Sequence, residues 1–274
     1  FSINAPGVSI RWQTETGMSI PDLGTDASGD TPAVPSAELN VRSFNGKRGE
    51  AVENPSLGTV ALPEKAVAYT SYNQIAPTAL DGTGTRQDPY TISSLGQWRT
   101  FESIVNQKDT VEVTNESNTN AVSTAVPYPG GVSSDTFDCT FAGKYVSLLC
   151  DLDFNNMMDC MPVGGKLPNT TTILTKNYFG GIFDGNGHNL IHLDIKVPLG
   201  GNNTCIGVFG AIYNATVRRV NRVGGITEGS GPLGGIVGYS LQSILEDCTN
   251  QSQITGVTWA GGIVGRNKGI VARC

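Results

Sequence analysis

The chain has 274 residues, a net charge of −6, 35 glycines and only 15% charged residues. This acidic balance argues against a nucleic-acid-binding protein, because phosphate recognition needs clustered Lys and Arg. No run of 18 apolar residues occurs, so no membrane span is expected. No phosphate loop, nucleophile elbow or dinucleotide fingerprint occurs in the sequence, so no cofactor is expected.

Residues 1–79 form a region of distinct composition, rich in proline and glycine and poor in large apolar residues. Such a composition does not supply a hydrophobic core. We expect an extended segment that packs along the main domain or on a neighbouring subunit, where it could add a strand. The main domain is expected over residues 80–274.

A helix is predicted near residues 95–106. Ser94 is a good N-cap, and Gln97 completes the pattern of a capping box. Trp98 and Phe101 share a helical face with Ile104, and this face is expected to bury itself in a core. Trp98 is therefore interpreted as a core residue, with a ligand platform as the alternative.

Residues 108–134 are polar and rich in Thr, Asn, Ser and Val, and they read as an insertion after the helix. The alternation of Val111, Glu112, Val113 and Thr114 predicts an exposed strand. Connections of this length are uncommon without a function, so the insertion is a candidate recognition element for an unspecified ligand.

A short phrase recurs in the C-terminal half, as residues 207–210, 235–238 and 262–265, at steps of 28 and 27 residues. A second phrase follows each copy, as residues 217–220, 245–248 and 271–274. Such spacing indicates stacked repeats. Each copy of the first phrase is bracketed by the predicted structural glycines Gly207, Gly210, Gly235, Gly238, Gly262 and Gly265.

The apolar runs within the repeats are short and β-branched, which favours strands over helices. One repeat has room for roughly three strands of about five residues. The predicted fold is therefore all-β, a right-handed parallel β-helix (solenoid) closed at its start by the helix near 95–106. Phe209, Val237 and Val264 should form one inner column. The glycines should allow the backbone to adopt, at the corners, conformations that other residues rarely adopt.

These phrases resemble the GLUG motif, found in bacterial cell-surface proteins and beside the catalytic domain of IgA-cleaving metallopeptidases. The resemblance implies a β-helix architecture rather than the peptidase activity. Residues 160–164 depart from the pattern, because a tryptophan would be expected before Pro162. Further segments that match the family's phrases are residues 84–85, 88–92, 143–148, 151–153 and 179–188.

The six cysteines follow no metal-binding spacing. Cys248 and Cys274 fall at equivalent repeat positions, where either a disulfide or two stacked thiols would fit. Asn-x-Ser/Thr sites would carry glycans in a secretory route. They begin at Asn115, Asn169, Asn202, Asn214 and Asn250.

The acidic residues and the two histidines are the candidates for a catalytic site. Asp151 and Asp153 would lie roughly 7 Å apart on one strand face, a spacing that glycosidases use, but no further catalytic residue is placed beside them. Asp184 begins an Asp-Gly-Asn-Gly stretch that reads as tight turns rather than a calcium loop. His188 and His192 lack the intervening Glu of a zinc-peptidase motif, and no metal site is expected.

Together these features predict a non-catalytic extracellular or cell-surface β-helix module, structural or adhesive. The basic group Arg218, Arg219 and Arg222 is expected to form a solvated corner. No polar cap follows the third repeat, which predicts either further repeats or a head-to-tail filament, with self-association or another surface protein as partner. The alternatives are a glycan-binding or polysaccharide-degrading β-helix and a stalk fragment of a larger adhesin or protease.

Overall fold

The computed structural model describes residues 71–115, 120–165, 177–197, 205–256 and 259–274, together with four short N-terminal strands. The chain divides into two compact units, residues 1–67 and 68–274. In the first unit, two antiparallel pairs are described: β1 (Asn4–Ala5) with β2 (Val8–Ser9), and β3 (Arg42–Phe44) with β4 (Ala51–Glu53).

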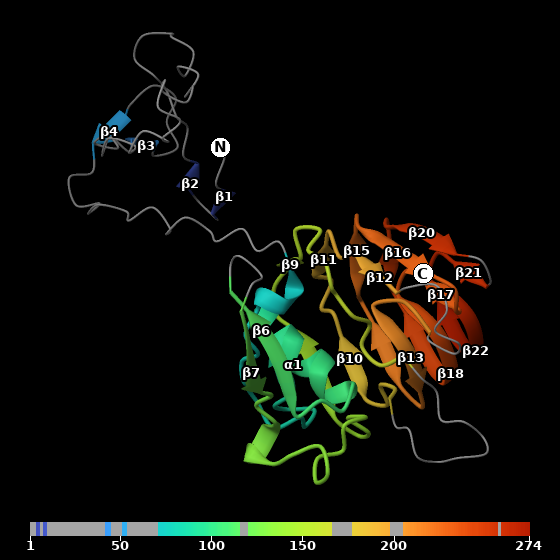
Figure 1. Cartoon of the computed structure of the whole chain (residues 1–274). Helices are drawn as coiled ribbons and strands as arrows, with labels where there is room; N and C mark the ends of the chain where they lie inside the picture. Colours follow the sequence, from blue (N-terminus) through green and yellow to red (C-terminus); the bar gives the residue numbers. More distant parts are fainter. Residues whose placement is uncertain are drawn as a thin grey trace, which may run out of the picture. The chain divides into compact units, whose positions relative to one another are not determined.

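The second unit is mostly β, and its described part contains one α-helix, α1 (Leu95–Val105), and the 3-10 helices η1 (Tyr72–Gln74) and η2 (Pro129–Gly131). Figure 1 shows its strands gathered into a curled sheet. The strands are β5 (Tyr90–Ile92), β6 (Thr110–Thr114), β7 (Ala121–Ala125), β8 (Tyr145–Leu148), β9 (Leu152–Asp153), β10 (Ile182–Asp184), β11 (Asn189–Ile191), β12 (Ile195–Lys196), β13 (Phe209–Tyr213), β14 (Thr216–Arg218), β15 (Asn221–Val223), β16 (Ile226–Gly229), β17 (Leu233–Gly234), β18 (Val237–Glu246), β19 (Thr249–Asn250), β20 (Gln253–Gly256), β21 (Ala260–Gly261) and β22 (Val264–Ala272).

Parallel pairing dominates the second unit. One ladder runs β5–β8–β10–β14–β18–β22, and β13 also pairs with the long strand β18. A second runs β9–β11–β15–β19, a third β12–β16–β20, and β17 pairs with β21. The exception among these strands is the antiparallel hairpin of β6 and β7, which lies in the predicted insertion. Strands distant in sequence are therefore neighbours in space.

The strand register coincides with the sequence repeat. Phe209 of β13 pairs with Val237 of β18, which pairs in turn with Val264 of β22. Val217, Leu245 and Val271 are matched in the same way. Between the last two copies the first phrase advances by 27 residues and the second phrase by only 26. The register of β18 and β22 shifts by this one residue between Leu241 and Ile244, opposite Lys268 and Ile270. This irregularity absorbs the shorter spacing without turning the inner side chains outward.

Helix α1 begins as predicted. The Ser94 hydroxyl accepts a hydrogen bond from the Gln97 amide at 3.2 Å. The Gln97 side chain reaches back to Ser93 rather than to the N-cap, with Oε1 accepting from the Ser93 amide at 2.8 Å. Only half of the predicted capping box therefore forms at Ser94, while a complete one starts η1 at Ser71.

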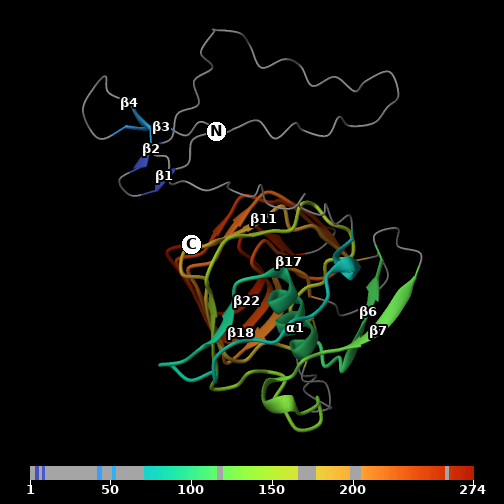
Figure 2. The same ribbon diagram turned by 90° about the vertical axis from the view of Figure 1, so that its left-hand side faces the viewer.

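The apolar face of α1 packs into an aromatic core. Trp98 is 2% exposed and Phe101 is fully buried. The Phe101 ring lies 5.7 Å from that of Phe183 and 6.4 Å from that of Phe209, and the Trp98 ring lies 5.8 Å from that of Phe154. Figure 2 shows α1 lying across the space that the curled strands enclose. Trp98 is thus a core residue, as predicted.

Non-glycine residues occupy the left-handed region at equivalent places after three neighbouring strands. Arg219, Asp247 and Arg273 have φ values of 52°, 54° and 52°. Such values are uncommon for residues with a Cβ, and ion pairs accompany them here. Arg219 contacts Asp184, and Arg273 Nε contacts Asp247 Oδ1 at 2.6 Å.

The prediction of a solvated basic corner is correct for Arg218 and Arg219 and wrong for Arg222. The side chains of Arg218 and Arg219 are 40% and 49% exposed and both bind Asp184. Arg222 is 0% exposed, because it pairs in register with the buried Leu190 and shares its inward-facing position. Alternation along β15 makes this position internal whatever residue occupies it.

Candidate functional site

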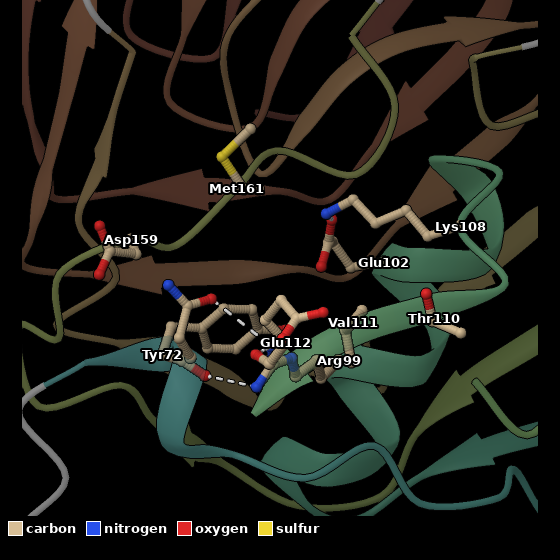
Figure 3. A pocket seen from close by; sticks show the side chains of 10 residues that line it. Tyr72, Arg99, Glu102, Lys108, Thr110, Val111, Glu112, Asp159 and Met161 are labelled. Carbon is tan, nitrogen blue, oxygen red and sulfur yellow. Dashed lines mark hydrogen bonds and ion pairs between the residues drawn. The ribbon is translucent and has the colours of Figure 1, made fainter. Parts of the chain in front are cut away.

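A hollow of about 220 Å³ opens beside α1 in the second unit (Figure 3). Its walls come from η1, α1, β6 and the segment 159–161, so the predicted insertion contributes one of them. The lining residues are Tyr72, Asn73, Arg99, Glu102, Lys108, Thr110, Val111, Glu112, Asp159 and Met161.

Arg99 holds three of these walls together from within α1. Its Nη1 donates to the Tyr72 carbonyl at 3.0 Å and also to the Ile75 carbonyl, which fixes η1 against the helix. Its Nη2 donates to the Glu112 carbonyl of β6 at 2.8 Å. The side chain is 3% exposed, and burial lowers the pKa of its guanidinium, opposed by the nearby Tyr72 and Glu102.

Glu102 lies one turn further along α1 and on the same face, because residues three apart in a helix are neighbours. It is 2% exposed. Its Oε1 accepts from Asn106 Nδ2 and lies 3.5 Å from Lys108 Nζ. Burial raises the pKa of the Glu102 carboxyl, and the positive charge of Lys108 offsets only part of that effect. The hollow therefore contains a nearly buried acid beside a half-exposed ammonium group.

Asp159 completes the opposite wall. Its Oδ2 accepts from the Ser71 hydroxyl at 2.8 Å, and the same Ser71 caps η1. A parallel bridge between Ser71 and Met158 brings these segments together. The Ser71–Gln74 spacing is a readable capping pattern, but its contact with a residue 88 positions away depends on the fold. No local pattern in the sequence therefore indicates this site.

The repeat glycines serve close packing rather than the corner conformations expected of them. None of Gly207, Gly210, Gly235, Gly238, Gly262 and Gly265 has a positive φ. A Cβ at Gly210 would lie 2.2 Å from the Gly164 carbonyl oxygen, and one at Gly235 would lie 2.2 Å from that of Gly262. Backbone segments approach closely at these two positions, and a side chain has no room there. Gly262 differs, because a Cβ at that position would have nothing within 4 Å.

Cys248 and Cys274 are neighbours, as their repeat positions predict. The Cys248 amide donates to Cys274 Sγ at 3.4 Å. Both are free thiols in the structure, so of the two alternatives it shows neighbouring thiols rather than a bridge. Cys248 is buried and Cys274 exposed, and burial raises the pKa of the Cys248 thiol to about 12.

The predicted glycosylation sites differ in accessibility. Asn115 and Asn214 are exposed. Asn250 is half-buried, and its amide packs where a Cβ of Gly235 would lie. Asn169 and Asn202 lie outside the described residues.

The candidate catalytic carboxylates bind neighbouring strands. Asp151 accepts from the Asn189 amide at 2.9 Å and from Asn189 Nδ2 at 2.8 Å. Asp151 Oδ1 also lies 3.3 Å from His188 Nδ1, and Asp153 Oδ1 lies 3.1 Å from His192 Nδ1. The expectation that no further candidate catalytic residue lies beside these aspartates is therefore wrong, because strand pairing brings a histidine to each of them. Asp184, predicted to begin a tight turn, accepts from the Asn186 amide at 2.9 Å and contacts two arginines. No group of three or more metal-ligating side chains is found in the described part of the chain.

Comparisons with family models, curated proteins and solved structures find no match for the chain. Across the described residues, none of the helices has the length and apolar character needed to cross a membrane.

Proposed function

We propose that residues 80–274 form a right-handed parallel β-helix of GLUG type that works outside the cell as a non-catalytic structural or adhesive module. The observation that carries this proposal is the agreement between sequence repeat and strand register. Phe209, Val237 and Val264 sit in one parallel ladder, 28 and 27 residues apart in sequence. A chain that lays equivalent residues on one another produces an elongated, rigid body.

The absence of catalysis is supported by what the carboxylates do. Asp151 accepts from Asn189 and lies 3.3 Å from His188, and Asp184 binds two arginines. Asp194 Oδ1 accepts from the Ile226 amide at 3.0 Å, and Asp194 Oδ2 lies 3.1 Å from Lys196 Nζ. These contacts stabilise the stack, and they leave the acidic residues in structural rather than catalytic surroundings.

Self-association, or binding to another surface protein, is proposed at strand β22. In the described sheet β22 pairs with β18 on one side only, and Figure 1 shows it at the margin of the sheet. Ile270 and Val271 on this strand are 60% and 40% exposed. An edge with apolar side chains favours addition of another strand. The occupant is either a second copy or, under the stalk alternative, a further repeat of a longer protein.

Light scattering combined with negative-stain microscopy of the purified chain tests this proposal. We expect concentration-dependent oligomers or fibres, and we expect Ile270→Lys to remove them. The matched control is Val122→Lys, which changes an exposed residue of the β6–β7 hairpin (66% exposed) and should leave assembly intact. A chain that stays monomeric at every concentration would refute the filament form of the proposal.

The second candidate function is glycan binding. It is favoured by the hollow beside α1, because this site combines apolar and polar groups in a concave surface. A polysaccharide-degrading activity would need two carboxylates on opposite sides of a bound sugar, and release of reducing ends from surface polysaccharides is the assay that tests it.

A further inference from the structure

The hollow beside α1 has the dimensions of a site for one small ring. Its volume is about 220 Å³, below the roughly 300–1,000 Å³ of pockets for drug-sized ligands. Arg99 fixes its walls by bonding to η1 and to β6. The site is therefore preformed, and a ligand would not need to order these segments.

The lining groups retain unused hydrogen-bonding capacity of both kinds. Lys108 has three N–H donors, and its ammonium contacts Glu102 at 3.5 Å. Asp159 uses Oδ2 for Ser71, which leaves Oδ1 as an acceptor. Thr110 adds a hydroxyl to the lining, and Asn73 adds an amide whose Oδ1 accepts from Arg99 Nη2 at 3.4 Å. The lining therefore contains both donors and acceptors.

The charges of the lining argue against a simple ion as ligand. An anion would meet the carboxylates of Glu102, Glu112 and Asp159, while the Nη1 and Nη2 groups of Arg99 already donate to backbone carbonyls and to Asn73 Oδ1. A cation would meet Lys108 and the Arg99 guanidinium. A neutral molecule whose hydroxyl groups both donate and accept satisfies this lining without desolvating an unpaired charge.

Apolar groups complete the lining. Val111 is nearly buried, and Met161 is 43% exposed. Tyr72 also borders the hollow, but it is 2% exposed and Arg99 lies over its ring, 5.5 Å from the ring centre. We propose that this hollow binds one sugar residue of a glycan, with Lys108 and Asp159 contacting its hydroxyl groups and Met161 its apolar face. This inference rests on the second candidate function, glycan binding, and adds to it the size of the ligand and the side chains that contact it. The site is separate from the β22 edge.

Saturation-transfer NMR with the full chain tests this proposal. The probes are the methyl glycosides of mannose, galactose and N-acetylglucosamine at millimolar concentration, with inorganic phosphate as an anionic competitor. We expect transfer to at least one glycoside. We expect Lys108→Met and Asp159→Asn each to weaken binding by about tenfold or more, because a lost hydrogen bond to a charged group has that effect.

The matched control is Asp153→Asn, an exposed carboxylate bound to His192 outside the hollow, which should bind as the unmodified chain does. Far-UV circular dichroism checks that each variant is folded. Failure of all three glycosides to bind, binding that neither lining variant weakens, or displacement by phosphate would overturn the proposal. Ile270→Lys should abolish assembly and retain sugar binding, so failure of either proposal is recognised independently of the other.

Discussion

Arg222 pairs in parallel register with Leu190, so a fully buried guanidinium occupies the position next to a core leucine. Among the residues that the structure describes, no carboxylate bonds to it. Its Nη1 donates to Thr227 Oγ1 at 2.6 Å and to the Gly235 carbonyl at 2.8 Å, and its Nη2 donates to the Leu193 carbonyl at 2.6 Å. Burial lowers the pKa of this arginine to about 10, opposed by the more distant Asp194. Arg222 thus joins the backbone of neighbouring strands from inside the core.

Replacing this arginine should therefore destabilise the fold. Arg222→Met keeps a long unbranched side chain but leaves the carbonyls of Leu193 and Gly235 without their donor. We expect a loss of about 3 kcal/mol in the free energy of unfolding, because buried unsatisfied groups cost roughly 1–3 kcal/mol each. Urea unfolding measures it. Arg218→Met, which alters an exposed ion pair, should cost less than about 1 kcal/mol, and equal losses in the two variants would contradict the assignment.

The second prediction concerns stability in acid. Burial raises the pKa of Asp184, but hydrogen bonds from Arg219 and the Asn186 amide, with the charge of Arg218, lower it on balance. A carboxyl with a lowered pKa in the folded state stabilises above its unfolded pKa of about 3.9, and that contribution is lost as pH falls through the folded value. Asp184→Asn should flatten the acid limb of a stability profile. An unchanged slope would show that the arginines do not lower the pKa of this carboxyl in the folded state.

Glu102 should behave in the opposite sense. Burial raises its pKa, so the folded state binds a proton that the unfolded state has already released. Its unfavourable contribution grows as pH rises through the unfolded pKa of about 4.3 and is complete above the folded value. Glu102→Gln is expected to stabilise the protein at neutral pH and to have little effect near pH 3. Denaturant unfolding at the two pH values tests this prediction. The control is Glu112→Gln, which alters an exposed residue and should leave the free energy of unfolding unchanged at both pH values.

The thiols provide a fourth prediction. Cys274 is exposed, whereas Cys248 is buried with a raised pKa. Alkylation of the folded chain followed by mass spectrometry should modify Cys274 well before Cys248, because the thiolate is the reactive form. In a separate sample of the unalkylated chain, oxidised glutathione, which accepts the two electrons and is itself reduced, should link the pair. Cys248→Ser should prevent this link. Simultaneous labelling of both thiols would contradict the buried position of Cys248.

The repeated strands of the fold could be predicted from the sequence, whereas the residues that line the hollow could not. Phe209 and Val237 reveal their equivalence because the repeat spaces them evenly. Arg222 was misread because residue type suggested solvent, while its position in β15 is set by alternation. The contact of Asp159 with Ser71 joins segments 88 residues apart, and no local pattern encodes it.

The central claim is that equivalent residues of successive repeats stack in parallel strands. An experimental density map of the full chain at side-chain resolution tests it most directly. The account predicts Val237 between Phe209 and Val264 in neighbouring parallel strands, with all three side chains facing inward. Antiparallel neighbours, or a register displaced by one residue so that Val237 faces solvent, would contradict it.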